Sequence, residues 1–144
     1  MITVHPSKKL VHVYDPIYFV NLFAYFSVDQ AKVNRLAKHH GFDTFTCDGW
    51  FARTLLMRAN GGSRAVLLFK PDLDLATLTH EAFHAVSQTL VTKIALTDNN
   101  DEAYAYLLGY YTGGIMAQPA HTVKGRGSWR PIQELRLSFG TAGN

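Results

Sequence analysis

One short segment of the chain combines residue types and a spacing that can perform metal-assisted chemistry. It reads His80-Glu81-Ala82-Phe83-His84. On a helix, residues four apart stand on the same face, so His80 and His84 can offer two imidazole nitrogens to one metal ion. Glu81 is rotated by about 100° from His80, which places its carboxylate beside the ion, where it can accept a proton from a bound water. With seven His and three Glu in 144 residues, this pattern arises by chance in about 0.7% of such chains.

The residues around this motif predict a helix over about 73–90. On the helical wheel, the side opposite the two His is formed by Leu75, Leu78, Ala82, Ala85, Val86 and Thr89. Thr77 and Gln88, which share the face of the His pair, are polar. The pattern therefore indicates a helix that packs on a core through one side and exposes the His pair on the other. The alternative interpretation is a histidine pair at the surface or core edge that binds no metal.

A catalytic zinc site takes three protein ligands and leaves a fourth position for water, so a third ligand must come from elsewhere in the chain. The candidates for it are Asp98, Asp101, Glu102 and His121. Glu102 is favoured because it opens a second expected helix, over about 100–116. That helix carries a stripe of Glu102, Tyr106, Gly109 and Gly113, and the glycines would let it approach the His helix closely. A Glu in the first turn of a helix is also ordinary helix-dipole chemistry, which is the alternative for Glu102.

Together, His80-Glu81-x-x-His84 and, 18 residues later, Glu102 in an Asp-Glu-Ala-x-Ala-Tyr helix resemble a gluzincin-type zinc metallopeptidase. The resemblance is to the small, single-domain kind found among phage and prophage hypothetical proteins, and it covers about residues 42–116. It implies that His80, His84 and Glu102 bind a zinc ion and that Glu81 is the general base.

The resemblance also implies how the substrate is held and how the reaction proceeds. An edge strand of the sheet, favoured within residues 42–69, holds an extended peptide by strand addition. A further donor usually stabilises the oxyanion; Tyr106 is favoured because it lies one turn beyond Glu102, with Tyr110 and His121 as alternatives. We therefore expect a zinc-dependent peptidase that hydrolyses a peptide bond through a metal-activated water, with the motif Glu as general base. Its expected partner is a protein or peptide substrate.

The elements that must position this site belong to one α+β domain, residues 1–144, with its core at about 42–116. We expect a minimal zincin-like domain, in which a small antiparallel or mixed sheet packs on helices and the Glu-bearing helix follows the His helix. Strands are expected at 42–47, 50–58 and 65–69. The first two would be joined by a hairpin turn at Asp48-Gly49.

The first 41 residues predict further elements. Residues 2–14 alternate loosely and predict one or two short strands. Residues 17–26 predict a short buried helix after an N-cap at Asp15, although their aromatic residues also suit a strand. A clearer helix is expected to open with the capping pair Ser27 and Gln30 and to end at Gly41.

The composition fits a soluble domain with a modest positive charge. The formal net charge is +3, and the single cysteine, Cys47, excludes an internal disulfide and a cysteine-based zinc cage. The longest apolar run, residues 17–26, is too short to span a membrane, and the N-terminus lacks the layout of a signal peptide. We therefore expect a cytoplasmic protein, located in the host cytosol if it is phage-encoded.

Residues 119–144 form a basic tail, which is expected to be extended or partly ordered. Within it, residues 124–130 mix basic side chains with Trp129, a combination that can serve phosphate and base contacts. Nucleic acid is thus an alternative partner, although a solvated tail is favoured. The alternative function is a catalytically silent zinc-binding module, or a nucleic-acid-binding or protein-binding module, that uses the same fold and the basic tail.

Overall fold

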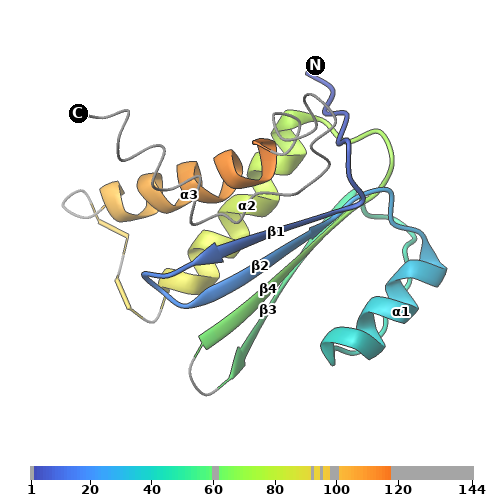
Figure 1. Cartoon of the computed structure of the whole chain (residues 1–144), viewed down its shortest axis with the longest axis horizontal. Coiled ribbons are helices and arrows are strands. Elements are labelled where there is room, and N and C mark those ends of the chain that lie inside the picture. The colour runs from blue at the N-terminus through green and yellow to red at the C-terminus, as the bar shows by residue number, and fades with distance from the viewer. Residues whose placement is uncertain (1, 60–61, 92, 95, 98–100, 118–144) are drawn as a thin grey trace, which may run out of the picture.

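The computed structural model describes residues 2–59, 62–91, 93–94, 96–97 and 101–117. In this part of the chain, three helices pack with a four-stranded mixed sheet in the order β1-β2-β4-β3, as Figure 1 shows. The strands are β1 (Leu10–Asp15), β2 (Val20–Tyr25), β3 (Ala52–Ala59) and β4 (Gly62–Phe69), and the helices are α1 (Gln30–His40), α2 (Leu75–Leu90) and α3 (Asp101–Met116). β2 and β4 run parallel, whereas the β1–β2 and β3–β4 pairs are antiparallel. The predicted α+β class is therefore confirmed.

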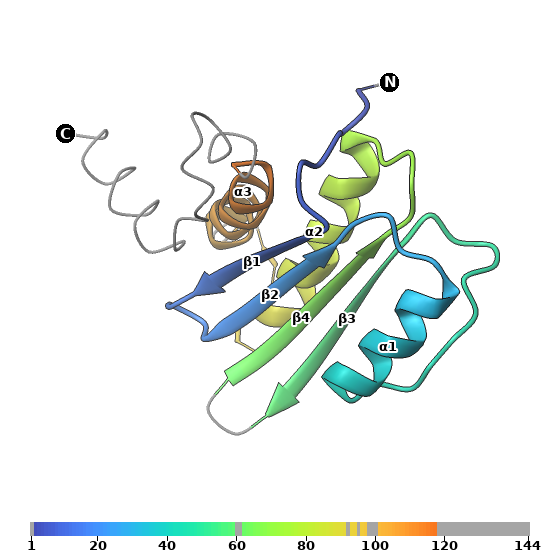
Figure 2. The ribbon, with the colours of Figure 1, turned by 45° about the vertical axis from the view of Figure 1, so that its right-hand side comes forward.

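The helices lie on both faces of the sheet. α2 and α3 pack together on one face, and α1 lies on the other (Figure 2). Alternate residues of β1 and β2 enter the core on the α2 and α3 side, where Val13 and Leu22 are fully buried. A smaller core beneath α1 joins Val33 and Leu36 to Val66 of β4. The core therefore begins before residue 42, because β1 and β2 are part of it.

The helix predicted over residues 17–26 is wrong, and the strand considered as its alternative is confirmed for residues 20–25, which form β2. Asp15 does not cap a helix; its Oδ1 accepts hydrogen bonds from the backbone nitrogens of Ile17, at 2.9 Å, and Tyr18, at 3.2 Å. These bonds close the turn between β1 and β2, so the chain returns antiparallel to β1. β2 then pairs with β1 on one side and with β4 on the other. This pairing satisfies the backbone hydrogen bonds of a segment whose local sequence is also compatible with a helix.

α1 ends at Gly41, as the sequence predicts, but it begins with a different cap. Gly41 adopts the left-handed conformation (φ 81°), and its nitrogen donates to the carbonyl of Ala37. The N-cap is Asp29, whose carboxylate accepts from the backbone nitrogen of Lys32 at 2.8 Å. The predicted capping pair of Ser27 and Gln30 is therefore wrong.

The strand predicted at residues 42–47 is also wrong, because this segment is irregular. The Gln30 side chain binds it directly, donating to the carbonyl of Phe45 and accepting from the nitrogen of Cys47. The Asp48-Gly49 turn exists, with Gly49 at φ 79°, but it does not join two strands. The hairpin is formed by β3 and β4 instead, which leaves the other side of β3 as an edge of the described sheet.

The close approach between β4 and the turn before β2 requires a glycine at position 62. A Cβ atom there would lie 2.7 Å from the carbonyl oxygen of Phe19, and Phe19 itself has a positive φ of 55°.

Within the described residues, no helix has the length and apolar character needed to cross a membrane. The predicted basic tail, residues 119–144, lies outside the described residues.

Candidate metal site

The two histidines of the motif face each other on α2. Asp74 caps this helix by accepting a hydrogen bond from the nitrogen of Thr77 at 2.6 Å, so the helix begins about one and a half turns before the motif. The Nε2 atoms of His80 and His84 are 3.0 Å apart, and both side chains are exposed. Two imidazole nitrogens bound to one tetrahedral zinc ion would lie about 3.3 Å apart, given Zn–N bonds of about 2.0 Å. The pair is therefore close to the spacing that one metal ion requires.

Glu81 completes the group. A ligand atom from each of His80, Glu81 and His84 lies within 4.8 Å of the others, and no other such group occurs among the described residues. Unlike the histidines, Glu81 is buried, with 7% of its surface exposed. The hydroxyl of Thr54 on β3 lies 2.6 Å from Glu81 Oε2 and 3.0 Å from the Glu81 carbonyl oxygen. The sheet thus holds the carboxylate that the helix presents beside the His pair.

The packing of α2 confirms the predicted buried side except at Leu75, which is half-buried and lines an open pocket. Its buried residues are Leu78, Glu81, Ala82, Ala85, Val86, Thr89 and Leu90. Thr89 is satisfied within the helix, since its hydroxyl donates to the carbonyl of Ala85 at 2.7 Å. A second contact fixes α2 to the edge strand, where the guanidinium of Arg58 donates to the carbonyl of Gln88 at 2.8 Å. Two side chains of β3 therefore anchor the face of α2 that borders the motif.

The stripe of α3 that was predicted to approach α2 has no described residue packed against its glycines. Cβ atoms built at Gly109 and Gly113 would meet nothing within 4 Å, and Glu102 and Tyr106 are exposed. The stripe that packs instead consists of Tyr104, Leu107, Tyr111 and Ile115. Burying these large apolar side chains removes far more surface from water than the glycine stripe could, so they decide how α3 is rotated. The predicted close approach through the glycines is wrong.

The proposed third ligand is consequently not part of the group. Glu102 and Asp101 both belong to the first turn of α3, where carboxylates interact favourably with the helix dipole. Neither joins the cluster formed by His80, Glu81 and His84. The other two candidates, Asp98 and His121, lie outside the described residues.

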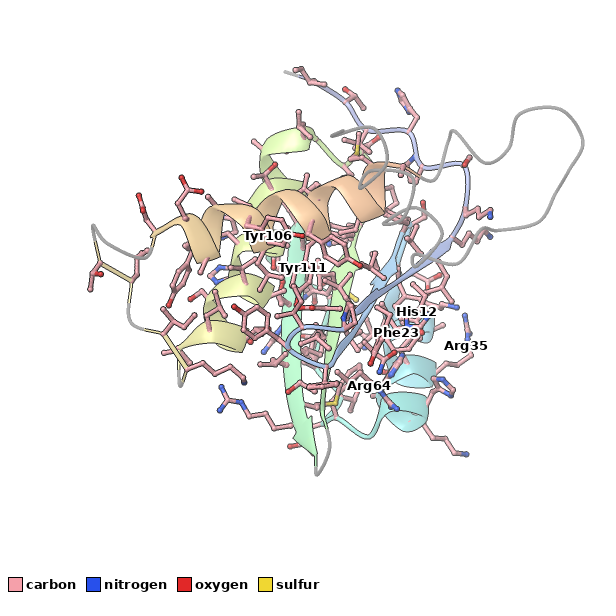
Figure 3. All side chains as sticks on the ribbon, turned by 60° about the vertical axis from the view of Figure 1, so that its left-hand side comes forward. His12, Phe23, Arg35, Arg64, Tyr106 and Tyr111 are labelled. Carbon is pink, nitrogen blue, oxygen red and sulfur yellow. The ribbon has the colours of Figure 1, made fainter. Side chains whose placement is uncertain are left out.

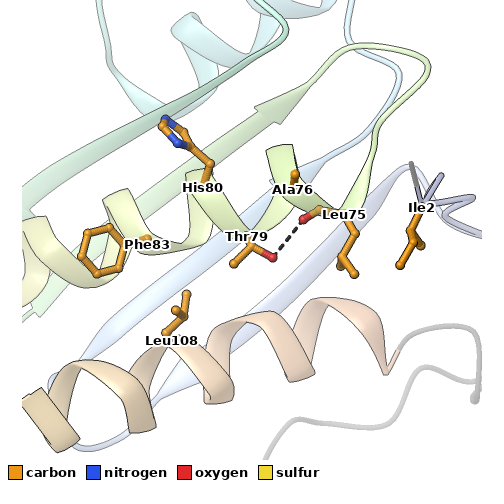
Figure 4. A pocket seen from close by; sticks show the side chains of 7 residues that line it. All are labelled: Ile2, Leu75, Ala76, Thr79, His80, Phe83 and Leu108. Carbon is orange, nitrogen blue, oxygen red and sulfur yellow. Dashed lines mark hydrogen bonds between the residues drawn. The ribbon is translucent and has the colours of Figure 1, made fainter.

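An open pocket of about 610 Å³ adjoins the motif on the α3 side of α2 (Figure 4). It is lined by Ile2, Leu75, Ala76, Thr79, His80, Phe83 and Leu108. Figure 4 shows Leu108 of α3 across from Thr79 and Phe83, with the ring of His80 directed away from them. Most of the described residues that line the pocket are apolar, and His80 is the only histidine among them. The pocket could therefore receive an apolar side chain, but on the side of α2 from which the His80 ring points away.

Sequence reasoning missed Thr54. It stands on the face of β3 that also carries Leu56, which packs against the core under α2. The alternation shows that this face points inward, but nothing local distinguishes a Thr that binds Glu81 from one that merely suits a strand. The pairing depends on the arrangement of α2 over β3.

The chain matches no protein-family model, no curated protein and no solved structure among those compared with it. Any function must therefore be argued from the site itself.

Proposed function

We propose that this chain is a zinc-dependent peptidase, with His80 and His84 as metal ligands and Glu81 as general base. The observation that carries the proposal is the facing pair of Nε2 atoms, 3.0 Å apart, with a carboxylate in the same cluster. Imidazole nitrogen and carboxylate oxygen are donors that zinc commonly takes in proteins. The chemistry of the donors and the spacing of the pair fit a zinc ion. The third protein ligand stays a prediction, with Glu102 as the candidate that the sequence favours.

Glu81 is suited to the transfer of a proton. A zinc ion, when bound, would supply Lewis acidity that polarises a peptide carbonyl and makes water more acidic. Thr54 donates to Oε2 of Glu81, which leaves Oε1 to accept the proton of the attacking water and return it to the leaving amine. Because the carboxylate is buried and hydrogen-bonded, it has few alternative orientations, and this preorganisation supports the assigned role.

The position of β3 supports a peptide as the substrate. β3 is an edge strand of the described sheet, and Thr54 lies on it next to the motif. An edge strand offers backbone donors and acceptors to which an extended peptide can add as a further strand. A peptide bound along β3 would run beside the His pair.

Tyr106, the predicted oxyanion donor, is 57% exposed on α3, and its role stays a prediction.

Metal analysis with matched variants tests this proposal. Purified protein is expected to bind about one zinc per chain, and His84→Ala should lose the metal together with the cleavage of a mixture of quenched fluorogenic peptides. Glu81→Gln should keep the zinc and lose cleavage, since the amide cannot accept the proton. His39→Ala, an exposed histidine of α1, is the control and should retain both properties. Normal cleavage by Glu81→Gln would refute the assignment of the base.

A catalytically silent metal-binding module is the second candidate. The specific observation in its favour is that Glu102 does not join the cluster, so the described residues supply two histidines and one carboxylate. In that case Glu81 would bind the metal itself and would not act as a base. Glu81→Gln would then weaken zinc binding, and the wild-type protein would cleave no peptide.

A further inference from the structure

α3 lacks charge on every side once its first turn is complete. Residues 103–116 contain no Asp, Glu, Lys, Arg or His. Tyr106 and Tyr111 both belong to this run (Figure 3), yet Tyr111 is fully buried whereas 57% of Tyr106 is exposed. Met116, at the end of the helix, is 38% exposed. A helix that is apolar all round is normally buried all round, so the exposed side of α3 indicates that something further covers it.

This side of α3 continues into the open pocket beside α2. Leu108 lines the pocket from α3, and the exposed Ala105 stands one turn before it on the same side of the helix. From α2 the pocket is lined by Leu75 and by Phe83, which is 39% exposed. The described residues that line it include no carboxylate, lysine or arginine. We refer to this pocket, bounded by Leu75, Phe83 and Leu108, as the helix groove; it favours an apolar occupant.

The chain leaves α3 beside this groove. The helix ends at Met116, and the nitrogen of Ala117 donates to the carbonyl of Gly113. Residues 118–144 follow. α2 and α3 run in opposite directions, so the end of α3 lies near the beginning of α2, where Leu75 lines the groove (Figure 1). The segment 118–144 is therefore the nearest part of the chain that could cover the groove.

One stretch of this segment has the pattern of a half-buried strand. Leu135, Leu137 and Phe139 occupy alternate positions, separated by Arg136 and Ser138. In an extended chain the three apolar side chains point to one side and the two polar ones to the other. Such a stretch buries its apolar side when it lies on an apolar surface and keeps its charge in water.

The lengths of the stretch and of the groove agree. Residues 135–139 span about 13 Å when extended, and the wall of α2 from Leu75 to Phe83 is about 12 Å long. The connecting residues 118–134 can span up to about 55 Å, which is enough to return along α3 in either direction. Because the stretch is attached to α3, its effective concentration at the groove is on the order of millimolar, an advantage that no separate partner has.

We propose that residues 135–139 dock into the helix groove as an extended segment, with their three apolar side chains against Phe83 and Leu108. Docking removes apolar surface of both the segment and the helices from water. The groove lies on the side of α2 from which the His80 ring points away. The docked segment therefore leaves the His pair accessible, and the proposal does not depend on the peptidase activity.

Disulfide trapping in the full chain tests this proposal. In a Cys47→Ser background, Leu137→Cys is combined with Leu108→Cys in the groove. The control combines it with Ala31→Cys, an exposed position of α1 on the opposite face of the sheet. Under mild oxidation we expect the groove pair to form a disulfide within one chain at least about tenfold faster than the control pair, because docking raises the effective concentration of the two thiols.

A second substitution tests the wall of the groove. In the groove pair, Phe83→Ser should slow disulfide formation at least about fivefold, because it removes apolar surface that the segment covers. Phe51→Ser is the matched control, since Phe51 is 84% exposed and does not line the groove. It should leave the rate unchanged. Circular dichroism and thermal unfolding establish that each variant is folded.

A dye that binds exposed apolar surface gives a readout without engineered cysteines. The double variant Leu135→Ser, Leu137→Ser should free the groove and raise the fluorescence of bound anilinonaphthalene sulfonate about twofold or more. Val123→Ser changes an apolar residue of the same segment outside the docking stretch, and it should behave as wild type.

Three outcomes would overturn the proposal. The first is an equal rate of disulfide formation in the groove pair and the control pair. The second is unchanged dye fluorescence in the leucine double variant. The third is a disulfide that forms only between two chains, in protein that light scattering shows to be dimeric. That result would assign the groove to a second copy of this chain.

Discussion

The hydroxyl of Thr54 on β3 lies 2.6 Å from Oε2 of Glu81 on α2. This contact joins the edge strand to the helix that carries the His pair, and it reaches the one carboxylate of the cluster. The same hydroxyl is 3.0 Å from the carbonyl oxygen of Glu81, so it reaches both the side chain and the backbone of one residue. The position of Glu81 is therefore set by the sheet as well as by its own helix.

Thr54→Val should impair the site without disrupting the strand. Valine has nearly the same shape and a high preference for strands, so β3 should persist, but the buried Glu81 carboxylate loses a donor. We expect the free energy of unfolding in urea to fall by about 1–3 kcal/mol in metal-free protein. If the proposed peptidase activity is correct, kcat/KM should also fall about tenfold, as for other residues that orient a metal site.

Thr54→Ser is the matched control, because it keeps the hydroxyl and should stay close to wild type in both measurements. Urea unfolding tests the contact independently of the proposed function. Equal unfolding free energies for the Val and Ser variants would show that the Thr54 hydroxyl does not stabilise Glu81.

The sequence predicts the parts of this molecule that depend on local periodicity. The apolar side of α2, its exposed His pair and the glycine that ends α1 all follow from the spacing of residues along one helix. The β3–β4 strands follow from β-branched and apolar runs interrupted by glycine. These features are set within one element, so distant contacts change them little.

The wrong predictions concern features that only distant contacts decide. Residues 20–25 become β2 because β1 and β4 are available on both sides, and residues 42–47 lose their strand because Gln30 binds their backbone. The rotation of α3 depends on burying Tyr104 and Tyr111 rather than on its glycines. For the same reason the Thr54–Glu81 contact could not be predicted from the spacing of residues.

Glu102→Gln tests the third-ligand prediction directly, with Asp101→Asn as its neighbour control. Both residues are exposed in the first turn of α3, so both variants should cost a similar, small amount of stability, about 0.5 kcal/mol. If Glu102 binds zinc, its variant alone should lower zinc affinity by about tenfold or more in a competition titration with a chelator. Equal affinity of the two variants would remove Glu102 from the ligand set.

The buried His40 should make stability depend on pH. Burial, together with the positive charges of His39 and Arg64, lowers the pKa of His40 from 6.5 to about 4. Its Nε2 lies 2.7 Å from the hydroxyl of Tyr25, in an environment that holds the neutral ring. Between about pH 4 and 6.5 the unfolded chain binds the proton and the folded chain does not, so stability falls as the pH is lowered through this window.

We expect this single group to contribute about 2 kcal/mol across that window, measured as the free energy of unfolding in urea at several pH values. His40→Gln should be less stable at neutral pH but should lose this part of the pH dependence. His39→Gln, an exposed neighbour, should retain most of it. A pH profile that is unchanged in His40→Gln would assign the effect to other groups.

Tyr111→Phe should destabilise the contact between α3 and β1. The Tyr111 hydroxyl donates to Oδ2 of Asp15 at 3.0 Å, and both residues are buried. Burial and the adjacent carboxylate raise the pKa of Tyr111, so the hydroxyl remains protonated and able to donate at all ordinary pH values. Removing it leaves Oδ2 without this donor, whereas Oδ1 keeps its two backbone bonds in the β1–β2 turn. The loss in unfolding free energy should be about 1–3 kcal/mol.

The matched control is Tyr110→Phe, whose hydroxyl donates to the half-buried backbone carbonyl of Tyr14 at 2.8 Å. This variant should lose less unfolding free energy, because no buried charge is left short of a partner. If Tyr110→Phe proved the more destabilising of the two, the Asp15–Tyr111 pair would not be the main polar link between α3 and the sheet.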